Sequence, residues 1–192
     1  MATQTLISIE EYLRTTSDPD CEYVRGEIVQ RAMPAYDHAE WQKILITWFA
    51  NHEREWGIRA LPELRVQVDP NEFRIPDVTI LARTAPREQI ITHPPLAVFE
   101  ILSPSDTMKG MLDKLEAYQR MGIPAIWVID PQIAPKVQSV TGEKTGVTSM
   151  PRNPGHAATW LYSSGHLTPA NVFELPGTAF RVSISEIAAL LD

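Results

Sequence analysis

The chain has 192 residues, which is enough for one domain with a sizeable hydrophobic core. Its net charge of −7 counts against a large basic surface for nucleic acid, although a local patch of Lys109, Lys114 and Arg120 is compatible with it. Cys21 is the only cysteine, which excludes an internal disulfide and a zinc site built from several cysteines. No apolar run reaches the roughly 18 residues of a membrane span. Residues 1–4 lack the features of a signal peptide, so we expect a cytoplasmic protein that does not enter a membrane.

The first elements along the chain are predicted to be a short helix and a hairpin. Ser8 precedes Glu11 by three residues, which is the spacing of a capping box, so a helix is expected at residues 8–13. The segment 21–29 alternates in polarity around Gly26, which favours two short strands joined by a tight turn.

The strongest helix prediction covers residues 37–56. Asp37 is suited to cap its start, and Gly57 is suited to end it. Apolar side chains recur at helical spacing between these two points, as expected of a helix with one buried face. They are Trp41, Ile44, Leu45, Trp48, Phe49 and Trp56.

The second half of the chain combines strands with another helix. A helix is expected at residues 106–121, opened near Ser105 and Asp106 and ended by Gly122 and Pro124. Residues 131–157 are expected to form loops, and a last helix is expected at 185–191. The predicted strands are Leu64–Asp69, Asp77–Ala82, Leu96–Ser103, Ala125–Asp130, Trp160–Tyr162 and Val172–Glu174. This order predicts a single α/β or α+β domain over residues 1–192, with a mixed sheet flanked by helices.

Two of these apolar strands carry a carboxylate. Asp77 stands at the start of one strand, and Glu100 lies inside the next. A buried charge is costly unless it is paired or holds a metal ion, so two such acids on consecutive strands indicate a divalent-cation site. The alternative is that backbone amides satisfy one acid and that the other lies at a strand end. Oxygen ligands suit Mg²⁺ or Mn²⁺, and the backbone carbonyl of Ile101 is a candidate further ligand.

The ordered motifs of the chain resemble the Uma-type putative restriction endonuclease family, within the PD-(D/E)XK nuclease superfamily. The residues that carry this resemblance extend over most of the chain. They are Glu22–Glu27, His38, Ile75–Val78, Val98–Ser105, Asp113–Tyr118, Gly122–Pro124 and Trp127–Pro131. The resemblance implies a restriction-endonuclease-like fold and a Mg²⁺- or Mn²⁺-dependent endonuclease that hydrolyses phosphodiester bonds in DNA.

The same resemblance assigns roles to individual residues. Asp77 and Glu100 match the metal-binding acids, and Glu22 matches an acid near the N-terminus that completes the metal site. The superfamily lysine normally follows the glutamate by two residues, but that position is Leu102 here. Lys114, from the following helix, matches the lysine that replaces it. A solvated helix lysine is the alternative for Lys114, although Gly110 leaves it without an acid one turn earlier.

Other residues are open to two interpretations. Glu27 is either a second acid of the site or a polar strand residue, and His38 either binds phosphate or is a polar residue of the first helical turn. Tyr118 is expected to pack with its hydroxyl hydrogen-bonded. The segment Ser103–Asp106 is expected to cap the next helix, and the tryptophans are expected in the core or in a homodimer contact.

The sequence therefore leaves two rivals to a DNA endonuclease. One is a binding or regulatory module that keeps the nuclease fold without turnover. The acidic net charge, and the absence of a lysine two residues after Glu100, favour this rival. The other is a metal-dependent hydrolase of small phosphate esters.

Overall fold

The computed structural model describes residues 6–14, 20–131, 157–175 and 178–191, so most of the loop expected at 131–157 lies outside the described residues. The helices are α1 (Ile9–Arg14), α2 (Tyr36–Trp56), α3 (Met108–Met121) and α4 (Ile184–Ala188). The strands are β1 (Glu22–Val24), β2 (Glu27–Val29), β3 (Ile58–Pro62), β4 (Val66–Asp69), β5 (Glu72–Arg74), β6 (Val78–Ala82), β7 (Ala97–Ile101), β8 (Ala125–Asp130), β9 (Ala158–Ser163), β10 (His166–Pro169), β11 (Val172–Glu174) and β12 (Arg181–Ser183).

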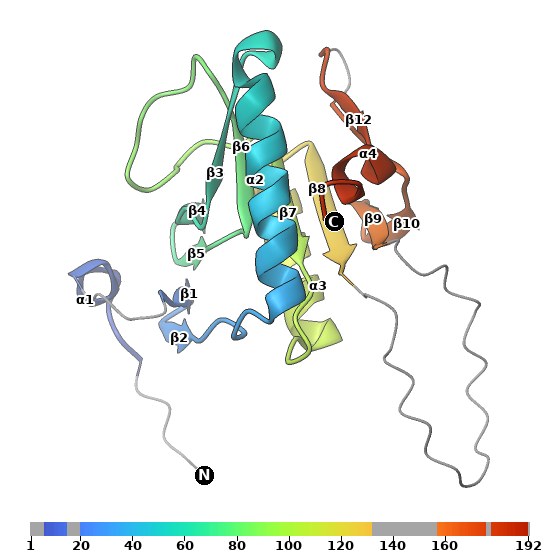
Figure 1. Cartoon of the computed structure of the whole chain (residues 1–192). Coiled ribbons are helices and arrows are strands. Elements are labelled where there is room, and N and C mark those ends of the chain that lie inside the picture. The colour runs from blue at the N-terminus through green and yellow to red at the C-terminus, as the bar shows by residue number, and fades with distance from the viewer. Residues whose placement is uncertain (1–5, 15–19, 132–156, 176–177, 192) are drawn as a thin grey trace, which may run out of the picture.

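The main sheet has six strands in the order β10-β9-β8-β7-β6-β3. Strands β7 and β8 are parallel, and all other neighbours in this sheet are antiparallel. Parallel neighbours need a crossover connection, and α3 supplies it between β7 and β8. Helix α2 covers one face of the sheet and α3 lies behind it (Figure 1). The predicted class, a mixed sheet flanked by helices, is confirmed.

Alternation along β7 determines what each of its side chains contacts. Ala97, Phe99 and Ile101 belong to the core beneath α2 and α4, whereas Val98 belongs to the core beneath α3. Glu100 shares the face of Val98 and is buried at 2% exposure, where an apolar residue would normally pack. The fold therefore places a carboxylate in the layer between the sheet and α3.

The long helices end where they were predicted to end but begin elsewhere. Gly57 and Gly122 adopt the left-handed conformation that stops α2 and α3. The prediction that Asp37 caps α2 is wrong, because the helix already begins at Tyr36 and Asp37 falls in its first turn. The prediction of a cap near Ser105 and Asp106 is also wrong. Thr107 caps α3, and its hydroxyl accepts a hydrogen bond from the Gly110 amide.

A smaller sheet, in the order β2-β1-β5-β4, stands beside the end of the main sheet where β6 begins and β7 ends. The predicted hairpin forms its β1 and β2, and the turn residues Arg25 and Gly26 both have positive φ. Ser8 caps α1 as predicted, with its hydroxyl accepting a hydrogen bond from the Glu11 amide. Its Tyr12 stacks on Tyr23 of β1, which anchors this sheet.

Four strands were not predicted, namely β3, β5, β10 and β12. The segments Ala125–Asp130 and Val172–Glu174 are strands with the predicted bounds, and the predicted strands around 66, 78, 97 and 160 are present with shifted ends. The omission that matters most for function is β5, because it pairs with β1 and carries two buried charged side chains.

Candidate active site

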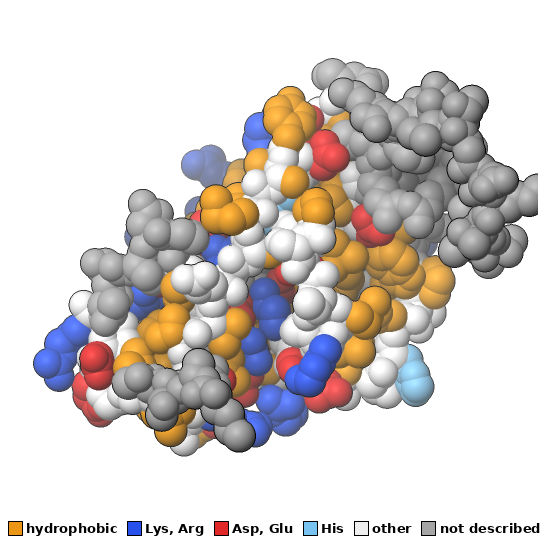
Figure 2. Space-filling model, turned by 90° about the horizontal axis from the view of Figure 1, so that it is seen from below, with side chains coloured by type: hydrophobic (Ala, Val, Ile, Leu, Met, Phe, Trp, Pro, Cys, Tyr) orange, Lys and Arg blue, Asp and Glu red, His pale blue; other side chains and the backbone are white. Residues whose placement is uncertain are grey.

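Several elements meet in one cleft of about 920 Å³ at the end of the molecule where β6 begins and α3 starts. Figure 2 views the molecule from this end and shows acidic and basic side chains interleaved with hydrophobic ones. Glu22 comes from β1, Asp77 directly precedes β6, Glu100 comes from β7 and Lys114 comes from α3. The cleft therefore collects side chains from both sheets and from the crossover helix.

Asp77 is buried, and both of its oxygens are engaged. Oδ1 accepts from Arg31 Nη2 at 2.9 Å, while Oδ2 accepts from the Ile101 amide at 2.7 Å and lies 3.2 Å from His38 Nε2. Burial opposes ionisation, but the hydrogen bond from His38, the charge of Lys114 and the Ile101 amide together hold the pKa of Asp77 below its usual value. Asp77 is therefore an anion fixed in one orientation.

Glu22 is held in the same way from the other side of the cleft. Its Oε2 accepts from Arg74 Nη1 at 2.9 Å, and its Oε1 accepts from the Ile75 amide at 3.1 Å. Burial raises the pKa of Glu22, but Lys114 and Arg74 outweigh burial and leave it lowered. Arg74 also contacts Glu72 Oε1 at 2.7 Å, so the buried charges of β5 support Glu22 from behind.

Glu100 differs from the other two acids. Its Oε2 lies 2.7 Å from Lys114 Nζ, and its Oε1 accepts from the Tyr118 hydroxyl at 2.6 Å. Burial raises its pKa, Lys114 opposes this, and the neighbouring Asp77 and Glu22 raise it further, to about 7. Of the three acids, Glu100 is therefore the one whose ionisation the fold disfavours.

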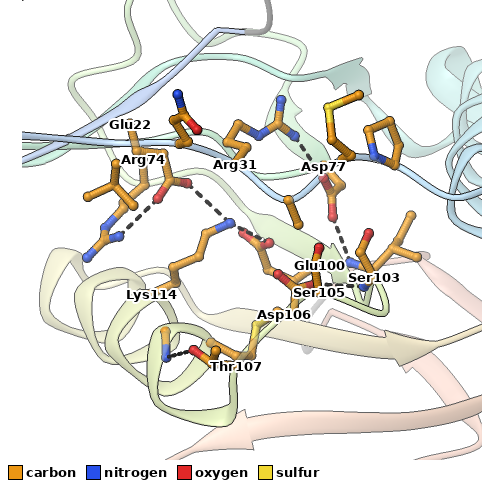
Figure 3. A pocket seen from close by; sticks show the side chains of 18 of the residues that line it. Glu22, Arg31, Arg74, Asp77, Glu100, Ser103, Ser105, Asp106, Thr107 and Lys114 are labelled. Carbon is orange, nitrogen blue, oxygen red and sulfur yellow. Dashed lines mark hydrogen bonds and ion pairs between the residues drawn. The ribbon is translucent and has the colours of Figure 1, made fainter.

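Lys114 joins the acids from different strands. Its Nζ lies 2.7 Å from Glu100 Oε2 and 3.2 Å from Glu22 Oε1, between the two carboxylates in Figure 3. Burial lowers the pKa of Lys114, but Glu100, Glu22 and Asp77 outweigh it and raise it above its usual value. The interpretation of Lys114 as a solvated helix lysine is wrong, because its side chain is only 17% exposed.

The structure thus brings together Asp77, Glu100, Glu22 and Lys114 in one cleft. Ile101 also lines it, and the observed contribution of this residue is its amide hydrogen bond to Asp77. Tyr118 packs with its hydroxyl hydrogen-bonded, as predicted. His38 is a polar residue of the first turn of α2, as one of its two interpretations had it, and it is buried against Asp77.

The three cations that could have formed a local basic patch are each paired with acids. Lys109 is exposed and pairs with Asp113 one turn along α3, whereas Arg120 extends to the buried Glu72. Lys114 is buried among acids. The three cations therefore pair with different acids.

Sequence reasoning overlooked Arg31 and the pair formed by Glu72 and Arg74. Arg31 lies between β2 and α2, in a segment without a periodic pattern. The signal for Arg74 was its place two residues before Pro76 and three before Asp77, where a cation inside an apolar run needs a buried counter-charge. No sequence signal marked Arg31.

The donor set of the cleft fits a hard divalent cation. Three carboxylates supply oxygen ligands, and Mg²⁺ takes few protein carboxylates while keeping several waters. Within the described residues, no three His, Cys, Asp or Glu side chains are arranged as a ready metal-binding group. Each of the three carboxylates instead contacts a cationic side chain of the chain itself.

A mixed sheet between helices, with carboxylates at the adjoining ends of neighbouring strands, defines a restriction-endonuclease-like fold. A family model described as "Uma2: Putative restriction endonuclease" matches residues 9–147, and the chain belongs to this family. The fold is also similar to a crystal structure titled as a putative nuclease belonging to DUF820 from Anabaena variabilis ATCC 29413. The TM-score is 0.69 at 20% identity, over 97% of this chain and 99% of that chain. No curated protein matches the chain. Among the described helices, none has the length and apolar character needed to cross a membrane.

Proposed function

We propose that this protein is a Mg²⁺- or Mn²⁺-dependent endonuclease that hydrolyses phosphodiester bonds in DNA. The single observation that carries the proposal is the convergence in one cleft of Asp77, Glu100, Glu22 and Lys114, from β1, β7, α3 and the segment before β6. Membership of a restriction endonuclease family agrees with it. A homodimer would present one cleft to each strand of a duplex, and this assembly stays a prediction.

In this proposal Asp77 and Glu100 hold the cation, with Glu22 beside them and the Ile101 carbonyl as a further candidate ligand. When bound, the cation would activate a water molecule and neutralise charge on the scissile phosphate. Leu102 occupies the sequence position at which the superfamily usually has its lysine. Lys114, whose ammonium contacts Glu100, takes over that role in this proposal, and it orients the attacking water or stabilises the phosphate charge. Tyr118 keeps Glu100 in place through the 2.6 Å hydrogen bond.

One observation favours a binding or regulatory module as the second candidate. Each of the three candidate ligands, Asp77, Glu22 and Glu100, is already paired with a cation of the chain, so their charge is compensated in part without metal. Such a protein keeps the fold for interaction and has no need to bind a divalent ion. A titration with Mn²⁺ separates the two candidates, because only the nuclease requires saturable binding.

The direct test is cleavage by purified protein of plasmid, oligonucleotide and nucleotide substrates with Mg²⁺ or Mn²⁺. We expect DNA to be cut, EDTA to stop the reaction, and the Asp77→Ala variant to be inactive, since a hard cation bound by few carboxylates is lost with one of them. If the Asp77→Ala variant cleaved DNA as fast as the wild type, the activity would come from a contaminating nuclease. A metal-loaded protein that cuts no DNA or RNA would favour the interaction module, and turnover of nucleotides alone would favour a small phosphate ester as substrate.

A further inference from the structure

Three positively charged side chains, Arg31, Arg74 and Lys114, line the described cleft in addition to His38, and they differ in how firmly they are held. Arg74 contacts two buried acids, Glu22 and Glu72. Lys114 likewise lies between two buried acids. Among the described residues, Arg31 has one buried ion-pair partner, Asp77. Its second partner, Glu63, is 51% exposed and lies 3.3 Å from Nη1. Because an exposed ion pair contributes little, Arg31 is the least firmly held of these cations.

Arg31 lines the cleft and is also partly exposed to solvent. It lies between β2 and α2, outside any helix or strand, and its side chain is 13% exposed. Figure 3 shows its guanidinium above Asp77, on the wall opposite Lys114. One side of the guanidinium faces the buried carboxylate, and the other faces the exposed Glu63.

The hydrogen bonds of Asp77 decide which of its contacts a metal ion would disturb. Oδ2 has two partners on rigid elements, the Ile101 amide of β7 and the His38 ring of α2. Oδ1 has Arg31. A divalent cation on Asp77 therefore competes with Arg31 and leaves the other two contacts in place. The guanidinium of Arg31 stays charged, because arginine is not deprotonated in proteins. Once it is displaced from Asp77, the Nη2 side of the guanidinium is therefore available to another anion.

We propose that Arg31 is a phosphate-binding residue that exchanges Asp77 for the DNA backbone when the site is loaded with metal. The inference rests on the proposed function and deepens it by naming the contact to the phosphodiester. The planar fork of arginine matches two phosphate oxygens, and Arg31 already uses two of its nitrogens on oxygens of two different acids. Without metal, Arg31 supplies the positive charge beside Asp77. With metal bound, its guanidinium is released to contact the DNA phosphates, in a cleft that has few other cations for them.

The test measures two affinities of the Arg31→Ala variant. Mn²⁺ affinity, measured by titration calorimetry without DNA, is expected to rise several-fold, because competition and binding are reciprocal. Affinity for a short DNA duplex in Ca²⁺ is expected to fall about tenfold, and the slope of log affinity against log salt should fall by about one. A purely structural Arg31, needed only to hold Asp77 in place, would give the opposite result for the metal, namely weaker Mn²⁺ binding.

Two further variants serve as matched comparisons. Arg31→Lys keeps the charge without the fork, so it should retain part of the DNA affinity and should not tighten Mn²⁺ as much as Arg31→Ala. Arg83→Ala removes another arginine that pairs with a glutamate, Glu53, away from the cleft. It should leave both affinities and the salt slope unchanged. Circular dichroism and a thermal melt establish whether each variant is folded. If Arg31→Ala does not fold, the two affinities are compared between Arg31→Lys and the wild type.

The outcomes separate this inference from the function on which it rests. A wild-type protein that binds no Mn²⁺ overturns the proposed nuclease and the exchange at Arg31 together. A wild-type protein that binds Mn²⁺ and DNA, with an Arg31→Ala variant whose DNA affinity and salt slope are unchanged, overturns only the role of Arg31. Weaker Mn²⁺ binding by Arg31→Ala also overturns it.

Discussion

Replacing Glu100 with glutamine should make the metal-free protein more stable at neutral and alkaline pH. Burial, together with the charges of Asp77 and Glu22, outweighs Lys114 and raises the pKa of Glu100 to about 7, from an ordinary value of 4.5. The folded state therefore binds more protons than the unfolded state between these values, and the free energy of unfolding falls as pH rises through this interval. At ~1.4 kcal/mol per unit of pKa shift, ionised Glu100 lowers the free energy of unfolding by about 3 kcal/mol at pH values above 7.

Glutamine has nearly the same shape and carries no charge. Its carbonyl can accept from Lys114, and its amide can donate to the Tyr118 hydroxyl, which both donates and accepts. We expect Glu100→Gln to exceed the wild type by roughly 2–3 kcal/mol near pH 8 and to equal it near pH 4.5, where Glu100 is largely protonated in the folded state. Stability would thus be lower in the natural protein because its site needs a carboxylate.

Urea denaturation of both proteins in EDTA, at several pH values from 4.5 to 8, measures this difference. A constant difference across the pH range would show that titration of Glu100 makes no contribution to stability. A variant less stable than the wild type at pH 8 would show that the ion pair with Lys114 outweighs the cost of burial.

Two other predictions concern catalysis and the core. Lys114→Met should lower the single-turnover rate of DNA cleavage by about 100-fold or more while retaining Mn²⁺ binding, because the lysine acts on the water or the phosphate rather than as a ligand; an unchanged rate would remove Lys114 from the mechanism. Phe99→Ala should lower the free energy of unfolding by about 3–5 kcal/mol in urea denaturation, because its ring packs between Phe49 and Phe173 in the core. A loss below about 1 kcal/mol would mean that this face of β7 is not tightly packed.

The elements that sequence could predict are those with a continuous signal. Strand β8 is a run of apolar residues ended by Asp130, and α2 shows an apolar stripe that ends at Gly57. Strand β5 gave no such signal. It has three residues, all buried, and two of them are charged and pair with each other. Burial of that kind depends on partners from other segments, so neither periodicity nor hydropathy reveals it.

The same distinction applies to the cleft. Asp77 and Glu100 were found because each interrupts an apolar strand, and antiparallel pairing of β6 and β7 brings them to one end of the sheet. Lys114 required the family pattern in addition to its place on α3. Arg31 could not be found, because its two acid partners lie 32 and 46 residues further along the chain, at Glu63 and Asp77. Only the folded arrangement shows that it shares a carboxylate with the proposed metal site.

The most direct test of the proposed metal centre is anomalous diffraction from a crystal soaked with Mn²⁺. We expect one strong peak in the cleft, within coordination distance of Asp77 and Glu100, and Arg31 turned away from Asp77. A peak elsewhere, or no peak from a crystal in which the cleft is open to solvent, would contradict the assignment of these carboxylates as metal ligands.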